Sequence, residues 1–243
     1  MRKEITVVIP AFNEERNIVN AVDSVVSTIE SHVSDYEIIV VDDGSTDRTR
    51  SLADAKAKTN PKIKVHSLGK NMGFGCAYRK GIDLAQKPLI TLFPGDNDMS
   101  SQVLRNLIEE MEDVDIVITY MTDNRNRSLL RKILSRLFVR LMNFIFNLKL
   151  KYYNGSFMCR LETIRKVELK SFGLAMVAEL LVRLIKSGHS YKEICFDHTG
   201  RKNEKSKALT LKSIMEVART ILILCWDIYI HPRTKGEKSC CAS

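Results

Sequence analysis

The sequence lacks the features that would assign it to a membrane-spanning, secreted or zinc-binding class. No apolar run approaches the roughly 18–20 residues that a membrane span needs, and no apolar signal region precedes the first predicted strand. The six cysteines contain no Cys-x-x-Cys spacing. We therefore expect a cytoplasmic protein without a signal peptide or transmembrane span, with free thiols in a reducing compartment.

Acidic residues are missing from one long stretch of the chain. Between Asp123 and Glu162 there is no aspartate or glutamate but there are nine lysines and arginines, within a chain of net charge +9. Such a basic patch indicates an anionic partner: a phosphate, a membrane surface or a nucleic acid. We expect no nucleic acid, because Phe138, Phe144 and Phe146 are spaced for a helix core rather than for stacking on bases.

Short apolar runs alternate with helical patterns over the first 120 residues, followed by longer helices. This alternation predicts an α/β fold with a mostly parallel sheet flanked by helices. The predicted strands cover residues 5–9, 37–41, 64–68, 89–93 and 114–120. The predicted helices cover residues 13–29, 45–58, 73–85, 101–111, 129–150, 176–186 and 209–230. Ser45 or Thr46 is the predicted cap of the second helix.

Two of the later helices are amphipathic. The helix over 129–150 carries arginine and lysine on its polar face, which suits a membrane surface, although an ordinary packed helix with a solvated basic face fits equally well. The helix over 209–230 has Trp226 and Tyr229 near its end, so it could lie at an interface or cover the core. The sequence does not decide between these alternatives.

Aspartates directly follow two of the predicted strands. Asp42 and Asp43 come after residues 37–41, and Asp96 and Asp98 come after residues 89–93. Alone, most Asp-x-Asp pairs are solvated turn residues. However, α/β sheets bind ligands at the carboxyl ends of their strands. Carboxylates there suit Mg²⁺ or Mn²⁺, which prefer oxygen ligands and share the rest of their shell with phosphate and water.

Four segments, taken in order, resemble the inverting family-2 glycosyltransferases, which have the Rossmann-like GT-A fold. They are Val8-Ile9-Pro10-Ala11-Phe12-Asn13-Glu14, Val40-Val41-Asp42-Asp43-Gly44-Ser45-Thr46-Asp47, Lys70-Asn71-Met72-Gly73-Phe74-Gly75 and Gly95-Asp96-Asn97-Asp98. Three later segments are similar to dolichyl-phosphate mannose synthases and related polyprenyl-phosphate glycosyltransferases. These are Asn154-Gly155-Ser156-Phe157, the stretch from Ala178-Glu179 to Gly188-His189, and Arg201 with Ser206-Lys207. The resemblance implies sugar transfer from a GDP- or UDP-linked donor to a polyprenyl phosphate.

The resemblance also implies roles for individual residues. Asp96 and Asp98 would act in catalysis and hold Mg²⁺ or Mn²⁺, and Asp96 and Asn97 would contact the sugar nucleotide. Arg201 and Lys207 would meet phosphates. Glu179 is the candidate general base, which a sugar-hydroxyl acceptor needs and a polyprenyl phosphate does not. The positions implied to hold the base and ribose are Pro10, Phe12, Glu14, Val41 and Asp43.

The chain departs from the synthases at two positions. Asn97 stands where they usually have alanine, and Met121 stands where a Gly-Thr-Arg segment supplies an arginine. Arg125, Arg127 or Arg131 could replace that charge. Two alternatives therefore stay open: a glycosyltransferase acting on a glycan hydroxyl, and a catalytically inactive protein that binds sugar nucleotides.

The resemblance suggests a division of the chain and a place in the cell. We expect a GT-A domain over 1–208, with a nucleotide half over 1–120 and an acceptor half over 121–208, then a C-terminal helix and basic tail over 209–243. The last four residues match a C-a-a-X prenylation box at Cys240, with basic residues upstream, although such short motifs also occur by chance. We expect a peripheral protein at the cytosolic face of a membrane.

Overall fold

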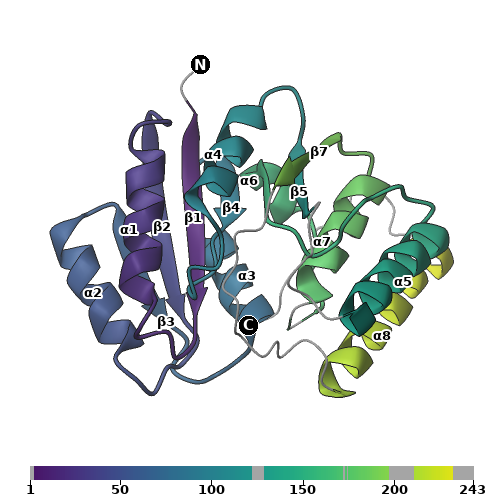
Figure 1. Ribbon diagram of the computed structural model, residues 1–243, viewed down its shortest axis with the longest axis horizontal. Coiled ribbons are helices and arrows are strands. Elements are labelled where there is room, and N and C mark those ends of the chain that lie inside the picture. Colours follow the sequence, from purple (N-terminus) through teal and green to yellow (C-terminus); the bar gives the residue numbers. More distant parts are fainter. Residues whose placement is uncertain (1–2, 122–128, 172, 174, 197–210, 232–243) are drawn as a thin grey trace.

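A sheet of seven strands forms the centre of the computed structural model, which describes residues 3–121, 129–171, 173, 175–196 and 211–231 (Figure 1). The strands are β1 Glu4–Ala11, β2 Asp35–Asp42, β3 Ile63–Ser67, β4 Leu89–Leu92, β5 Ile116–Met121, β6 Phe157–Arg160 and β7 Tyr191–Phe196. Their order is β3-β2-β1-β4-β6-β5-β7. β6 is antiparallel to β4 and β5, and the other described pairs are parallel. The predicted mostly parallel α/β sheet is confirmed.

Helices cover both faces of the sheet. One face is packed by α1 Ile18–Ile29, α2 Thr49–Thr59 and α4 Ser101–Glu110. The other is packed by α3 Phe74–Leu84, α6 Leu161–Arg165 and α7 Ala175–Lys186, and its hydrophobic cluster extends to α5 Leu129–Phe146 and α8 Leu211–Cys225. α8 continues into a π-helical turn, η2 Trp226–Ile230. In Figure 1, α2 lies at one end of the sheet, and α5 and α8 lie together at the other.

The central strands are buried on both faces, which explains their continuous apolar sequence. On β1, Ile5, Val7 and Ile9 pack with α1 and α4, whereas Val8 packs with α3. A parallel strand between two helix layers needs such a run, because successive side chains point to opposite faces. Burying each valine or isoleucine fully contributes about 1.5–3 kcal/mol of hydrophobic free energy.

Three elements were not predicted: β6, α6 and β7. β6 is held by contacts distant in the sequence, because the Thr91 hydroxyl donates to the Phe157 carbonyl oxygen at 2.5 Å. Just before β6, a Cβ on Gly155 would lie 1.9 Å from the Thr119 carbonyl oxygen, so only glycine lets this segment lie against β5. A four-residue strand carries too little periodicity to be predicted from sequence.

Two predicted helix starts were wrong. α1 begins at Ile18 and α2 at Thr49, each several residues later than predicted. Ser45 does not cap α2, because its hydroxyl accepts the Asn13 backbone N–H at 3.0 Å. Asp47 accepts the backbone N–H of Thr49 instead, at 2.9 Å.

The cysteines and the lengths of the helices bear on two of the expectations from the sequence. Cys76, Cys159 and Cys225 are free thiols. Among the helices of the described ranges, none has the length and apolarity to cross a bilayer. Cys240 lies outside the described residues.

Candidate active site

The loops that follow β1 and β2 are hydrogen-bonded to each other at the carboxyl edge of the sheet. Asn13, which has a positive φ of 56°, accepts the Thr46 backbone N–H through its side-chain oxygen at 2.9 Å. The Glu14 backbone N–H donates to the Thr49 hydroxyl at 2.7 Å, and the Glu14 carboxylate accepts the Asn17 amide at 2.8 Å. The segments 8–14 and 40–47, both used for the family resemblance, therefore form one continuous surface, which we call the ledge.

The aspartates at the end of β2, Asp42 and Asp43, fix the neighbouring loops. Asp42 accepts the backbone N–H of Ser45 at 3.0 Å and the hydroxyl of Ser67 at 2.8 Å. Asp43 is buried, and its two carboxylate oxygens accept the backbone N–H groups of Met72 and Gly73 at 2.7 and 2.9 Å. The structure therefore gives Asp43 a positioning contact that the sequence did not reveal. The positive φ of Gly73, 93°, is compatible with this turn.

Two apolar side chains remain exposed beside this ledge. Phe12, directly after β1, and Met72, held by Asp43, are both substantially exposed. Pro10 and Val41, which precede the two loops, are buried in the strands. An exposed aromatic ring next to fixed polar groups can provide a stacking surface for a planar base.

Asp96 and Asp98 lie on a tight turn after β4. The Asp96 carboxylate accepts the backbone N–H of Asp98 at 3.0 Å, and the Asn97 N–H donates to the Pro94 carbonyl oxygen at 3.1 Å. A Cβ on Gly95 would lie 2.8 Å from the Pro10 carbonyl oxygen, so this turn packs against the end of β1. Asp98 is exposed, and Asp96 is partly buried.

The departure at Asn97 has a conformational explanation. Its φ is 58°, in the left-handed region where asparagine is tolerated better than alanine. The turn that separates the two aspartates here therefore uses a backbone conformation that favours the residue found.

We expect Asn97→Ala to lower the free energy of unfolding by about 1 kcal/mol, because alanine is strained at positive φ. Asn97→Gly should stay within about 0.5 kcal/mol of the wild type. Urea unfolding measures both. Asn106→Ala is the matched control within α4, where alanine is the better helix former. Equal stability of Asn97→Ala and Asn97→Gly would contradict the conformational explanation.

The segment before β6 reaches the same edge of the sheet. The Ser156 hydroxyl contacts the Met99 sulfur at 2.8 Å, just after the Asp96–Asp98 turn. Ser156 also accepts the Thr119 backbone N–H through its carbonyl oxygen at 2.9 Å. The antiparallel strand β6 thus brings a segment from the second half of the chain next to the paired aspartates.

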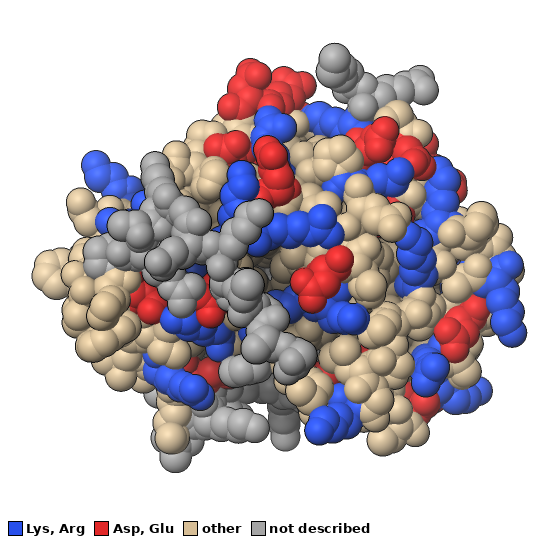
Figure 2. Space-filling model, turned by 180° about the vertical axis from the view of Figure 1, so that it is seen from behind, with Lys and Arg blue, Asp and Glu red and all other residues tan. Residues whose placement is uncertain are grey.

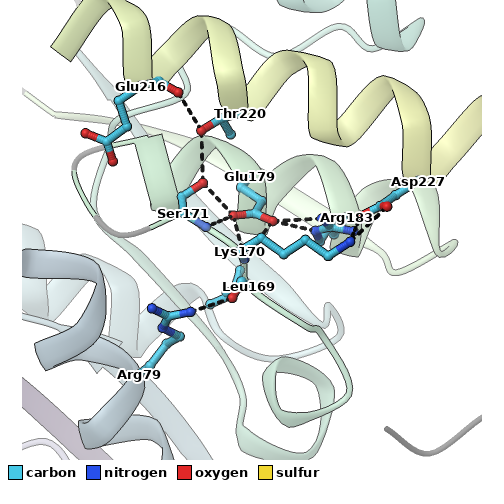
Figure 3. A network of polar contacts seen from close by, with 9 residues as sticks. All are labelled: Arg79, Leu169, Lys170, Ser171, Glu179, Arg183, Glu216, Thr220 and Asp227. Atoms are coloured by element: carbon cyan, nitrogen blue, oxygen red, sulfur yellow. Dashed lines mark hydrogen bonds and ion pairs between the residues drawn. The ribbon is translucent and has the colours of Figure 1, made fainter. Parts of the chain in front are cut away.

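Glu179 lies in a buried polar network rather than on an open surface (Figure 3). Its carboxylate accepts the backbone N–H groups of Lys170 and Ser171, at 2.8–3.1 Å, and the Ser171 hydroxyl at 2.6 Å. Arg183, one turn further along α7, donates to it at 2.8 Å. These contacts support a structural role that orders residues 170–171, and its role as a general base stays a prediction.

The same network connects α7 to η2. Lys170 and Arg183 each donate to the Asp227 carboxylate at 2.7 Å. Burial alone would raise the pKa of Asp227, but these hydrogen bonds outweigh it, and the pKa lies below its ordinary value. On the other side, Arg79 of α3 donates to the Leu169 carbonyl oxygen at 2.6 Å. The Ser171 hydroxyl also lies 3.1 Å from that of Thr220, so the segment 169–171 is held by α3, α7, α8 and η2.

Several predicted site residues lie outside the described part of the chain. These residues are Arg125, Arg127, Arg201 and Lys207, so their roles remain predictions. Near the end of β5, the Lys151 ammonium lies 4.1 Å from the centre of the Tyr120 ring. This places one basic residue of the patch beside that strand end.

The fold defines the class of protein. The glucosyl-3-phosphoglycerate synthase of Mycobacterium tuberculosis, solved with Mn²⁺, UDP and phosphoglyceric acid, matches at a TM-score of 0.69 and 22% identity, over 92% of this chain and 78% of that one. The likeness shows the GT-A fold. The model of glycosyl transferase family 2 matches residues 6–169, and the chain belongs to that family.

Two curated relatives share about a third of their aligned residues with this chain. The dodecaprenyl-phosphate galacturonate synthase of Rhizobium johnstonii is 30% identical over 172 residues, which cover 68% of this chain and 50% of that protein. The undecaprenyl-phosphate 4-deoxy-4-formamido-L-arabinose transferase of Aeromonas hydrophila is 32% identical over 137 residues, 56% of this chain and 42% of that protein. The chain thus matches half or less of the length of these relatives.

Proposed function

We propose that this glycosyltransferase moves a sugar, with inversion, from a nucleotide-sugar donor to a polyprenyl phosphate at the cytosolic face of a membrane. The observation that carries the proposal is the pair Asp96 and Asp98 on the turn after β4, at the carboxyl edge of a GT-A sheet. The two relatives whose names contain a polyprenyl phosphate support the acceptor class. Prenylation at Cys240 stays a separate prediction.

The donor, linked to UDP or GDP, would lie along the ledge formed after β1 and β2. Phe12 offers an exposed ring to the base. Asp43 fixes the Met72–Gly73 loop beside it. Asp96 and Asn97 would contact the sugar end of the donor. The remaining proposed donor contacts are Pro10, Glu14 and Val41 at the ledge, and Arg201 and Lys207 at the phosphates.

The residues present fit Mg²⁺ or Mn²⁺. Asp96 and Asp98 provide hard carboxylate oxygens two residues apart on one turn. Within the described ranges there is no group of three or more histidine, cysteine or acidic side chains suited to a metal. Donor phosphates and water would therefore complete the shell, as is usual for Mg²⁺. When bound, the metal supplies positive charge that stabilises the diphosphate leaving group.

The acceptor determines whether a base is needed. With a polyprenyl phosphate, a phosphate oxygen forms the new bond to the anomeric carbon while the bond to the donor diphosphate breaks. That oxygen is already an anion, so no side chain has to remove a proton. This chemistry is compatible with a fully buried Glu179. A sugar-hydroxyl acceptor would need a base at the reacting carbon.

The test is a transfer assay with the full chain. We expect radiolabel from one of a panel of UDP- and GDP-sugars to enter organic-phase polyprenyl phosphate in detergent, to stop on chelation and to resume with Mn²⁺ or Mg²⁺. Label on an oligosaccharide instead would support the hydroxyl-acceptor alternative. Nucleotide binding without any product would support a non-catalytic binding protein.

A further inference from the structure

Among the described residues, most of the exposed large apolar side chains lie at one end of the molecule. The described residues include thirteen exposed large hydrophobic side chains, and eleven of them belong to α5, α8 and η2. The eleven are Leu129, Ile133, Leu134, Leu137, Leu141, Phe144, Met215, Leu222, Trp226, Tyr229 and Ile230. The other two, Phe12 and Met72, lie at the proposed donor site. We call this surface of α5, α8 and η2 the end face.

The exposed residues of α5 are not the ones that pack the core. Met142 and Phe146 are buried in the hydrophobic core, whereas Leu137 and Leu141 are about half exposed and Phe144 is 87% exposed. A helix that only covers a core buries one apolar stripe and presents polar residues to water. α5 carries a second apolar stripe on its outer side, and such patches mark binding surfaces.

Basic residues run beside the outer stripe of α5. Lys132, Arg136 and Arg140 follow one another at four-residue intervals, and α5 contains no acidic residue. Arg136 and Arg140 are exposed. In Figure 2, seen from behind, the edge at the left, where α5 and α8 lie after the half-turn from Figure 1, shows uncharged surface with both basic and some acidic side chains near it.

The acidic residues of α8 and η2 turn inward. Asp227 is paired with Lys170 and Arg183 (Figure 3). Glu216 has a buried carboxylate oxygen, and its carboxylate lies close to Gly173. The exposed part of the end face described here is therefore apolar and basic.

Direct contacts join the two sides of the end face. The Tyr229 hydroxyl donates to the Ile145 carbonyl oxygen at 2.6 Å, and its ring stacks on Phe146 with the centroids 6.3 Å apart. Asp227 ties η2 to α7 through Arg183 at 2.7 Å. The apolar stripes of α5 and η2 thus form one surface whose parts are fixed relative to each other.

We propose that the end face docks on an anionic lipid bilayer, with its leucine and phenylalanine side chains in the acyl boundary and Arg136 and Arg140 at lipid phosphates. Trp226 and Tyr229 are residue types that favour the membrane interface. Twofold pairing of two copies would bring basic stripes together, which costs free energy. The proposal rests on the proposed function, because a polyprenyl-phosphate acceptor resides in a bilayer.

Vesicle flotation with the full chain, produced without lipid modification and without donor or acceptor, tests the docking. Wild type should bind phosphatidylcholine vesicles containing phosphatidylglycerol, and bind pure phosphatidylcholine more weakly. Leu137→Glu with Leu141→Glu should weaken binding to anionic vesicles about tenfold or more. Arg136→Glu with Arg140→Glu should weaken it about tenfold on anionic vesicles and little on neutral ones.

Two substitutions on α2, at the other end of the sheet, are matched controls. Ala55→Glu and Lys58→Glu make the same kinds of change at exposed positions and should leave binding unchanged. Unaltered flotation of both double variants would overturn the proposal. A wild-type dimer that the leucine variant converts to monomer, by sedimentation velocity, would overturn it in favour of self-association.

The detergent transfer assay separates this proposal from the function itself. Loss of flotation in variants that still transfer sugar in detergent supports docking. Transfer in detergent by a wild type that binds no vesicles would overturn docking and leave the function standing. Vesicle binding without transfer would count against the function alone.

Discussion

Asp98→Ala is expected to lower the rate of sugar transfer by about 10²–10³-fold, the range typical of removing one group that stabilises developing charge. Asp98 is exposed, so its truncation should leave the free energy of unfolding nearly unchanged. The measurement pairs initial rates at saturating Mn²⁺ with urea unfolding. Calorimetric titration of UDP or GDP, with and without Mn²⁺, should show that the variant loses the metal-dependent part of nucleotide affinity.

A matched control is available at the opposite edge of the sheet. β6 is antiparallel to both β4 and β5, so β4 and β5 run in the same direction. Asp98 follows β4 and the exposed Asp113 precedes β5, so the two aspartates lie at opposite edges of the sheet. Asp113→Ala should therefore keep both rate and stability. If Asp98→Ala retains more than about a tenth of the wild-type rate, Asp98 is not the metal ligand we propose.

Asp96 should respond differently because it also shapes the turn. Its carboxylate accepts the Asp98 backbone N–H, which Asp96→Asn can preserve and Asp96→Ala cannot. The asparagine variant therefore removes the charge with less change to the turn. Comparing the two variants separates the electrostatic contribution of Asp96 from its contribution to local structure.

The parts of the fold that repeat could be predicted from sequence. Runs such as residues 5–9 and 37–41 are buried on both faces, so their apolar pattern is continuous and distinct from that of the helices between them. The same alternation places Asp43 and Asp96 after strands that are neighbours of β1, and the structure confirms those strands. Local pattern and global topology agree here.

The remaining features depend on contacts between distant residues. β6 exists because Thr91 and Thr119 bond the segment around Ser156 from both sides, and no local pattern reports this. The hydroxyl that should have capped α2 is used by Asn13. The contacts of Asp43 with Met72 and Gly73 likewise join residues that are 29 and 30 positions apart in the sequence. Such tertiary hydrogen bonds override local propensity.

The sequence of the basic helix α5 did not show which of its sides faces the core. Its sequence fits both a core-packing helix and a surface-binding one, because it carries apolar residues on more than one side. Met142 and Phe146 belong to the first description, and Leu137 and Phe144 belong to the second. Which residues face the core depends on where the sheet lies, and a helical pattern alone does not contain that information.

Glu179→Gln is expected to lower the free energy of unfolding by about 3 kcal/mol, within the range for breaking a buried ion pair. The carboxylate is fully buried and accepts four hydrogen-bonding groups, including Arg183, and an amide cannot accept through its nitrogen. The melting temperature should fall by about 10 °C. Calorimetry or circular dichroism with urea measures the change.

The surface pair Arg50 and Asp54 provides the matched control. It has the same spacing of four residues along a helix, but both side chains are about half exposed and 3.8 Å apart. Asp54→Asn should therefore change the free energy of unfolding by no more than about 0.5 kcal/mol. A similar small change for Glu179→Gln would show that the buried network does not contribute as its contacts indicate.

The same variant distinguishes a positioning role from a base. If Glu179 orders residues 170–171 and, through Asp227, the η2 turn, the folded variant at low temperature should transfer sugar to polyprenyl phosphate with a largely preserved pH profile. If it removes a proton from a hydroxyl acceptor, kcat should fall by about 10²–10⁴-fold at every temperature, and the acidic limb of the pH profile should vanish. A phosphate acceptor needs no base. A preserved pH profile would therefore support both a structural role for Glu179 and a phosphate as the acceptor.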